Sequence, residues 1–293
     1  MLVLDHVSKT YRVGAFGRGR LAAVRDVSFE LRPGEVMSLI GESGSGKSTI
    51  GRMILRLARP TVGSITHEGA DIARFRGDAL KEYYRRVQGV FQDPFSSYNP
   101  IFKADRIFAI AHSEFFPDVG ADEWKERVRA ALDSVALNPD DILHKFPHQL
   151  SGGQLQRLLI ARALLLDIRY LVADEIISML DASTRIDVLN LLAELKARGL
   201  GILFITHDLS LGNYISDSTI ILRHGCVVEM GATVKVFGDP RHPYTKNLVA
   251  SVAHLHEKWR PGGAGGTATN GRVDRVEAPE LVLVEDDHLV AAG

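Results

Sequence analysis

The segment GESGSGKS, residues 41–48, constrains the fold of this 293-residue chain more than any other feature. It fits the pattern G-x-x-x-x-G-K-[ST] and lies between EVMSLIG, a run typical of a strand, and IGRMILRL, which has helical spacing. Its glycines let backbone N–H groups surround phosphate oxygens, and the N-terminus of the following helix adds partial positive charge. The flanking strand and helix argue against a chance turn rich in glycine and serine. The sequence therefore predicts a phosphate-binding core of the α/β class.

Two residues at the end of this segment have specific expected roles. Lys47 should reach the β- and γ-phosphates of a nucleotide, and the Ser48 hydroxyl should ligate magnesium. The expected nucleotide-binding residues of the loop are Gly41, Ser43, Gly44, Ser45, Gly46, Lys47, Ser48 and Thr49.

Four apolar runs that should form strands end in the loop itself or in a polar side chain. They are EVMSLIG, VQGVF before Gln92, RYLVA before Asp174 and Glu175, and GILFIT before His207. Ligands of open parallel sheets bind outside the carboxyl ends of the strands, so these groups should converge on one crevice. There Ser48, Gln92 and Asp174 should bind magnesium. Glu175 should polarise the attacking water as general base, with His207 and Gln92 as the other catalytic candidates.

Each of these polar residues also has a simpler interpretation. Adjacent carboxylates such as Asp174 and Glu175 usually mark a solvated turn. A histidine after a strand is more often a capping or core residue, and Gln92 alone would be an ordinary loop residue. Their common position after apolar strands favours the functional interpretation.

The rest of the N-terminal half divides into two regions. Residues 2–11 and 24–31 alternate in the manner of β-strands, and the Arg- and Gly-rich insert at 13–20 resembles a hairpin loop. From about 103 to 166 the patterns are mainly helical, with prolines as breaks. We interpret this stretch as a helical region inserted into the α/β core.

The C-terminal half returns to strands and helices. A strand at 169–175, a helix closed by Gly199 and a strand at 201–207 precede a hairpin that should turn at His224 and Gly225. The segment RPGGAGGTATNG, residues 260–271, has linker composition. The last twenty or so residues show no pattern that assigns them to an element.

Charge and cysteine content limit the partners and the compartment. Lys and Arg number 35 and Asp and Glu 36, so no net basic field would hold nucleic acid. The single cysteine, Cys226, cannot form an internal disulfide, and no export leader is recognisable. The apolar runs fall short of the ~20 residues that a membrane span needs. We expect a cytoplasmic protein that reaches a membrane only through partners.

A second glycine-rich motif, LSGGQ at residues 150–154, leads into the helical pattern QLQRLLIARALLL. Two roles are compatible with this position: Ser151 as the cap of the helix, and the helix N-terminus as a binding site for a phosphate. With this motif included, the chain resembles the ATP-binding cassette (ABC) transporter ATPase family. The motifs stand in that family's order: Tyr11 for adenine stacking, GESGSGKS, Gln92, LSGGQ, VADE, Asp181 of the D-loop, and His207.

The resemblance implies a P-loop nucleotide triphosphatase core with a mainly parallel sheet, an N-terminal antiparallel β subdomain and a helical subdomain at about 103–166. It extends to about Trp259, which implies an ABC ATPase domain over 1–259 and a C-terminal linker and tail over 260–293. It also implies ATP hydrolysis, with ATP and Mg²⁺ as cofactors. In this family two cassettes pair head to tail, and the LSGGQ of one covers the ATP of the other. The residues implied at that shared site are Ser151, Gly152, Gly153, Gln154 and Asp181.

Two further segments resemble one subgroup of the family. DPFSSYNP after Gln92 and GDPRHPYTKNLVAS at 238–251 are similar to ATPases of peptide, nickel and oligosaccharide importers. The subgroup implies two membrane-spanning permease subunits, a second ATPase subunit of the same or a homologous chain, and an extracytoplasmic solute-binding protein. The chain would then act at the cytoplasmic face of the cell membrane in the import of peptides or oligosaccharides. No cysteine follows HPYT, so no iron–sulfur centre is expected, and Ile176 replaces the proline that normally follows the catalytic glutamate.

Two other functional classes agree less well with the sequence than the importer ATPase does. A soluble ABC ATPase acting on ribosomes or DNA usually carries two cassettes or a coiled-coil insert, and this chain has neither. A plain P-loop kinase or GTPase would lack LSGGQ and the D-loop aspartate. For the importer, residues 83–110 are the expected docking face for a membrane subunit, because Phe91, Phe95, Tyr98 and Phe102 lie in a loop-rich segment. Phe91 is nearly as well suited to the core.

Overall fold

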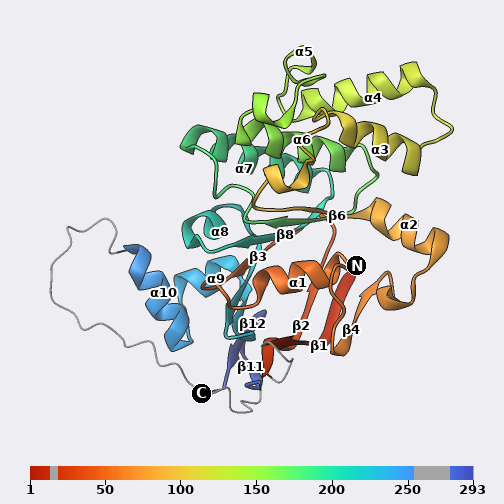
Figure 1. The fold of residues 1–293 in the computed structure, drawn as a ribbon. Coiled ribbons are helices and arrows are strands. Elements are labelled where there is room, and N and C mark those ends of the chain that lie inside the picture. The colour runs from red at the N-terminus through yellow and green to blue at the C-terminus, as the bar shows by residue number, and fades with distance from the viewer. Residues whose placement is uncertain (14–18, 254–277, 293) are drawn as a thin grey trace.

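An eight-stranded sheet forms the centre of the protein in this computed structural model, which describes residues 1–13, 19–253 and 278–292 (Figure 1). In spatial order its strands are β11 (Leu281–Glu285), β12 (His288–Ala291), β10 (Cys226–Ala232), β9 (Ser218–Arg223), β3 (Val36–Ile40), β8 (Gly201–Thr206), β7 (Tyr170–Asp174) and β6 (Val87–Val90). The strands from β9 to β6 run parallel, and β10, β12 and β11 continue the sheet antiparallel. The mainly parallel sheet confirms the predicted α/β class.

The central strands are apolar along their whole length because both faces of the sheet are covered. Every residue of β3, β7 and β8 is buried, as expected for strands of a parallel sheet. Alternate residues enter different cores: Leu171 and Ala173 belong to one cluster, Val172 to the other. Ile40 pairs with Thr206, and Asp174 pairs with Ile205. This register brings the carboxyl ends of β3, β7 and β8 to one edge.

A separate four-stranded antiparallel sheet is built from the N-terminal region. Its order is β2 (Gly19–Leu31), β1 (Leu2–Val13), β4 (Val62–His67) and β5 (Ala70–Asp71). Val13 pairs with Gly19, so the β-ladder extends into the segment that the sequence assigned to a loop, and residues 14–18 lie outside the described residues. Leu4 and Val27 share a core cluster with Ile50 of α1 (Lys47–Ile54), which joins this sheet to the phosphate-loop helix.

Helices predicted between about 103 and 166 are present and lie together beside the central sheet (Figure 1). They are α3 (Arg106–Phe115), α4 (Ala121–Ser134), α5 (Pro139–Ile142), the 3-10 helix η3 (Pro147–Gln149) and α6 (Gly152–Leu164). Leu132 and Leu158 share one core cluster with Leu192 of α7 (Ala182–Ala197), which packs this region onto the sheet. The remaining helices are η1 (Ile72–Arg74), α2 (Gly77–Arg86), η2 (Phe95–Ser97), α8 (Leu209–Ile215), α9 (Thr233–Gly238) and α10 (Pro243–Ala253).

The last described residues differ from the sequence interpretation of a linker and tail. Strands β11 and β12 form a hairpin, and β12 pairs with β10 through Glu229–Val290, Met230–Leu289 and Gly231–His288. The pairing buries His288 to 1% exposure and Glu229 completely. Local patterns did not indicate this, because the partner strand lies about sixty positions earlier and both strands are short. Residues 281–291 are therefore part of the central sheet.

Candidate nucleotide-binding site

The phosphate loop connects β3 to α1 through a backbone that only glycine accommodates easily. Gly44 has φ +80° and Gly46 has φ +108°, both in the left-handed region. A Cβ at Gly41 would collide with the carbonyl oxygen of Leu222, and one at Gly46 with the carbonyl oxygen of Ala23. The loop is therefore closely enclosed by β9 and β2, and its shape depends on these glycines.

Lys47 and Ser48 begin α1 and face the end of β7. The ammonium group of Lys47 donates to the carbonyl oxygens of Gly41 and Glu42, at 2.7 and 2.9 Å. Burial lowers the pKa of Lys47, although the carboxylates of Glu175, Asp174 and Glu42 oppose this shift. The lysine is thus a buried cation close to its acidic neighbours and to the loop.

Asp174 lies at the buried end of β7, next to Ser48. The Ser48 hydroxyl donates to Asp174 Oδ1 at 3.1 Å. Burial raises the pKa of Asp174, and the hydrogen bond from Ser48 opposes that shift. The two residues present hydroxyl and carboxylate oxygens side by side, which is a donor set that suits Mg²⁺.

Glu175 and His207 come together from the ends of β7 and β8. His207 Nδ1 lies 3.3 Å from Glu175 Oε1, and the side chain of Glu175 is 19% exposed against 60% for His207. The backbone N–H of Glu175 donates to Ile205 O at 2.9 Å, which ties the residue to the neighbouring strand. Contacts thus link Ser48 with Asp174 and Glu175 with His207. With Lys47, the chain neighbour of Ser48, these predicted residues lie in one place.

LSGGQ forms a capped helix start. The Ser151 hydroxyl accepts from the Gln154 backbone N–H at 3.2 Å, and the Gln154 side chain accepts from the Ser151 N–H at 2.9 Å. This reciprocal pair is a capping box. A Cβ at Gly153 would approach Thr184 Cγ2 to 2.9 Å, which shows how closely α6 passes α7. The capping interpretation of Ser151 therefore applies, and a role toward a nucleotide stays a prediction.

Asp181 lies beside this second group and caps α7. Its carboxylate accepts from the Ser183 hydroxyl at 2.6 Å and from the Thr184 N–H at 3.0 Å, and these bonds hold the pKa of Asp181 well below its usual range. Helices α6 and α7 pack in one core cluster, whereas α1, which begins with Lys47, packs in the other. Within one chain the structure thus separates LSGGQ and Asp181 from the phosphate loop.

Gln92 and Tyr11 stand apart from both groups in the contacts of the described residues. Gln92 is exposed just beyond β6. Tyr11 lies on β1, with the Lys9 ammonium group 5.0 Å from the centre of its ring. Their expected roles in binding magnesium and adenine stay predictions.

Sequence reasoning missed the polar contacts that join the Gln92 segment to α6. The buried side chain of Gln156 donates to Phe91 O at 3.4 Å, and Arg162 donates to Gln88 Oε1 at 3.1 Å. Tyr98, expected on the docking face, is instead buried to 8% exposure and donates to Leu155 O at 3.1 Å. The aromatic composition of the loop concealed this, because a tyrosine suits an interface and a core equally. Polar residues within the apolar pattern of α6 were the only available signal.

A glycine-rich loop between a parallel strand and a helix, with Ser48 and Asp174 in contact beside it, defines a P-loop nucleotide triphosphatase. The chain belongs to the ABC transporter family: the model described as ABC transporter matches residues 24–178. A second model, Oligopeptide/dipeptide transporter, C-terminal region, matches residues 228–277. These matches confirm the family resemblance, and a plain kinase or GTPase is excluded.

Curated relatives are similar over most of the chain. A putative peptide import ATP-binding protein of Brucella ovis is 43% identical over 234 residues, which are 79% of this chain and 73% of the relative. The oligopeptide transport ATP-binding protein OppF of Haemophilus influenzae is 40% identical over 233 residues, 79% and 70% of the two chains. OppF of Bacillus subtilis is 41% identical over 237 residues, 80% and 77%. The alternative of an ATPase acting on ribosomes or DNA finds no support in these relatives.

Solved structures agree with the fold. The dimeric, post-hydrolysis structure of the ATP-binding cassette MJ0796 bound to ADP and Pi matches with a TM-score of 0.71 and 28% identity, over 80% of this chain and 99% of that one. CbiO1 from Clostridium perfringens, part of the ABC transporter complex cbiONQ, matches with a TM-score of 0.69 and 23% identity, over 87% and 95%. The chain is thus an ATP-binding ABC ATPase. No helix in the described part combines the length and apolarity that a membrane crossing requires.

Proposed function

We propose that this chain is the ATP-hydrolysing subunit of an importer for peptides. The C-terminal match to oligopeptide/dipeptide transporters and the relatives named for peptide import support this solute class. Oligosaccharides, the other solute class that the sequence suggested, have no counterpart among the relatives described above. The proposed ATPase domain spans 1–259, with a helical subdomain at about 103–166, and the β11–β12 hairpin adds two strands to its central sheet.

The complete importer would contain two membrane-spanning permease subunits and an extracytoplasmic solute-binding protein. A second ATPase subunit, the same chain or a homologue, would pair with this one, as the dimeric MJ0796 structure suggests. The chain would then lie at the cytoplasmic face of the cell membrane, with no nucleic-acid partner.

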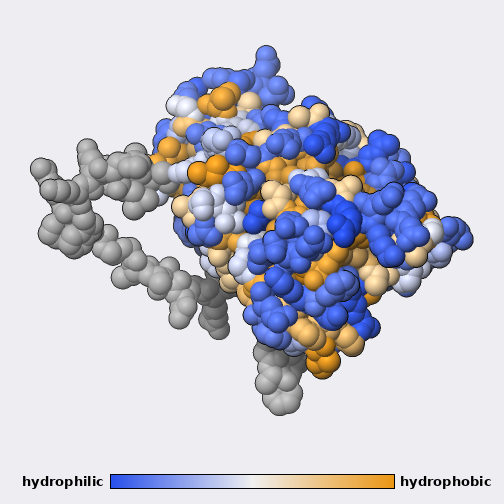
Figure 2. Space-filling view, turned by 90° about the horizontal axis from the view of Figure 1, so that it is seen from above, coloured by the Kyte–Doolittle hydropathy of each residue, from blue (hydrophilic) through white to orange (hydrophobic). Residues whose placement is uncertain are grey.

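The proposed docking face for a permease is the segment 83–110. Phe95, Ile101 and Ile110 are 48%, 76% and 51% exposed there, which suits a protein interface. The face that includes the helical region carries hydrophobic residues scattered among hydrophilic ones (Figure 2).

The proposed ATP site uses the residues of the phosphate loop, with Tyr11 against the adenine. Lys47 would turn from the carbonyls of Gly41 and Glu42 to the β- and γ-phosphates. Ser48 and Asp174 would hold Mg²⁺, with Gln92 as a further ligand, because their oxygens are the hard donors that this ion prefers. When bound, Mg²⁺ neutralises charge that develops on the phosphate oxygens.

Hydrolysis would depend on Glu175 as the general base for water. His207 lies 3.3 Å from its carboxylate and would hold it in orientation. The LSGGQ residues and Asp181 would complete the ATP site of the opposing subunit, where the N-terminus of α6 would face the γ-phosphate. The contact between Glu175 and His207 beside the Ser48–Asp174 hydrogen bond is the observation that carries this mechanism.

The solute class is tested with the assembled importer in proteoliposomes. ATPase activity should rise when the cognate solute-binding protein is loaded with a peptide library, and it should not rise with oligosaccharides or nickel. Stimulation by oligosaccharide alone would contradict the peptide assignment and leave the ATPase assignment intact.

A further inference from the structure

The HPYT segment packs against the base of the phosphate loop through Tyr244. This tyrosine is 7% exposed and shares a core cluster with Ile40, which ends β3 directly before Gly41, and with Ala291 of β12. The Arg223 guanidinium lies 4.9 Å from the centre of its ring. Arg223 directly follows Leu222, whose carbonyl oxygen leaves no room for a side chain at Gly41. The ring is therefore in place beside the first turn of the loop.

Glu42 lies in that turn, two residues after Ile40, with which Tyr244 shares its core cluster. Burial raises the pKa of Tyr244, and the nearby Glu42 carboxylate raises it further, while the Glu42 backbone opposes the shift. The hydroxyl is nevertheless buried without a hydrogen-bond partner among the described residues. Glu42 is thus the acidic neighbour of a buried hydroxyl that forms no hydrogen bond within the described part of the chain.

Glu42 is also the residue that Lys47 holds. The Lys47 ammonium group donates to the Glu42 carbonyl oxygen at 2.9 Å. This hydrogen bond would break if the ammonium group moved to a nucleotide phosphate. The end of the phosphate loop is held by a separate hydrogen bond, in which the Gly225 N–H donates to Ser45 O at 2.9 Å. We propose that Tyr244 is a positioning residue of the phosphate loop, whose hydroxyl bonds the Glu42 carboxylate when Lys47 engages nucleotide. The inference rests on the proposed role of Lys47.

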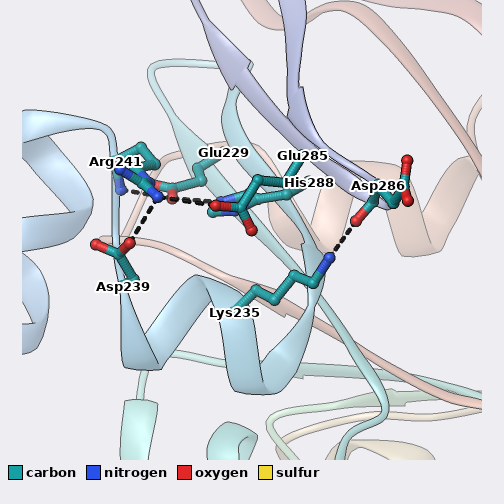
Figure 3. Close-up of polar contacts among 7 residues, drawn as sticks. All are labelled: Glu229, Lys235, Asp239, Arg241, Glu285, Asp286 and His288. Atoms are coloured by element: carbon teal, nitrogen blue, oxygen red, sulfur yellow. Dashed lines mark hydrogen bonds and ion pairs between the residues drawn. The ribbon is translucent and has the colours of Figure 1, made fainter.

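The segment that carries Tyr244 is itself anchored to the C-terminal hairpin. The buried carboxylate of Glu229 accepts from the backbone N–H groups of Arg241 and His242 at 2.8 and 3.0 Å. It also meets His288 Nε2 of β12 at 2.8 Å (Figure 3). Glu229 therefore fixes the backbone directly before α10, and with it the direction from which Tyr244 approaches the loop.

The test is the variant Tyr244→Phe in the full chain, which keeps the packed ring and removes only the hydroxyl. The KM for ATP and the Kd for ATP should rise about three- to tenfold, the range expected for one hydrogen bond. kcat should stay within about twofold, because Glu175 and His207 are untouched, and Tm should change little. A merely structural role would change Tm and leave the KM for ATP as it is.

Tyr170→Phe is the matched control. Tyr170 is 1% exposed, and its hydroxyl likewise has no hydrogen-bond partner among the described residues, but it begins β7 at the end away from Asp174. This variant should leave the KM for ATP unchanged. An unchanged KM in Tyr244→Phe, or an equal rise in Tyr170→Phe, would overturn the inference.

A double-mutant cycle with Glu42→Gln tests the proposed bond directly. If Tyr244 acts through the Glu42 carboxylate, the double variant should raise the KM no more than the stronger single variant, because both remove one interaction. Effects that multiply would refute it. The variant Lys47→Ala tests the proposed function separately from the role of Tyr244. ATP binding that survives this change would disprove the proposed role of Lys47, whatever the result for Tyr244.

Discussion

At the scale of single residues, the backbone at Glu175 is unusual. Its φ of +50° lies in the left-handed region, which few residues other than glycine adopt. The bonds that hold it there are its N–H to Ile205 O and the Ser178 hydroxyl to its own carbonyl. Ile176, which replaces the family's proline, is 1% exposed and packs in the main core cluster. Core packing therefore holds the residue directly after Glu175 in place.

Glu175→Gln should separate binding from hydrolysis. The amide keeps the shape of the side chain but cannot accept the proton of water, so ATP should bind while turnover falls at least about 100-fold. Paired subunits should accumulate with ATP bound. Single-turnover hydrolysis measures the effect, and Glu126→Gln, an exposed change on α4, should behave as wild type. A rate near that of wild type would exclude Glu175 as the base and direct attention to His207.

At the scale of elements, local patterns predicted most of the fold. The strand ends at Asp174 and His207 were recognisable because each follows a continuous apolar run, and parallel strands align their carboxyl ends. The capping box of Ser151 was also a local signal. The contact of the Gln156 side chain with the Phe91 carbonyl oxygen joins groups 65 positions apart, which no local period reveals. The β11–β12 hairpin escaped prediction for the same reason.

The β11–β12 hairpin contacts its neighbours through one buried polar pair and through exposed ion pairs. Glu229 and His288 are buried, whereas the ion pairs of Arg241 with Asp239 and Glu285 lie near the surface (Figure 3). Exposed pairs contribute little, about 0–1 kcal/mol each. A hydrogen bond to a buried charged group contributes more, roughly 1.5–3 kcal/mol. Among the polar side-chain contacts of the hairpin, the buried pair of Glu229 and His288 therefore contributes most.

Glu229→Gln should remove a pH dependence of stability. Burial raises the pKa of Glu229, but the nearby Thr245 hydroxyl and the hydrogen bonds from the backbone N–H groups of residues 241 and 242 and from His288 lower it more, to below its ordinary 4.5. A carboxyl whose folded pKa is depressed contributes stability above pH 4.5, and this is lost as the pH falls through the folded value. Denaturant unfolding measured from pH 7 to 3 should show that the free energy of unfolding of the wild type exceeds that of Glu229→Gln at pH 7, and that this difference disappears as the pH falls. Glu285→Gln, which changes an exposed carboxylate of the same hairpin, is the matched control and should show no such loss. A difference between the wild type and Glu229→Gln that does not depend on pH would contradict the proposed role of the Glu229 carboxylate.

At the scale of the whole molecule, one chain carries two separate groups of predicted site residues. Contacts link Lys47, Ser48, Asp174, Glu175 and His207, whereas LSGGQ and Asp181 cap helices α6 and α7 elsewhere. This division is what head-to-tail pairing requires, because each ATP would then be covered by the partner's α6.

Mixing two inactive variants should restore activity. Lys47→Ala removes the phosphate cation, and Gly152→Asp puts a negative charge where the partner's γ-phosphate should lie, so each variant alone should lose ~10³-fold in hydrolysis. In a mixed pair, one site receives both changes and the other receives none. Partial ATPase activity should therefore return in a membrane assembly that accepts both chains, or in the appropriate halves of a natural heterodimer. No recovery would mean that LSGGQ serves the nucleotide of its own chain.

Pairing of β12 with β10 also sets the order in which the protein can mature during synthesis. Ala291 completes a core cluster that includes Ile40, some 250 positions earlier. A ribosome adds roughly 5–20 residues per second, so β10 has a free edge until residues 288–291 have left the exit tunnel. Free strand edges invite pairing with other chains. The nascent chain is therefore open to aggregation through this edge from the time β10 emerges until residues 288–291 emerge, although the catalytic residues are already made by then.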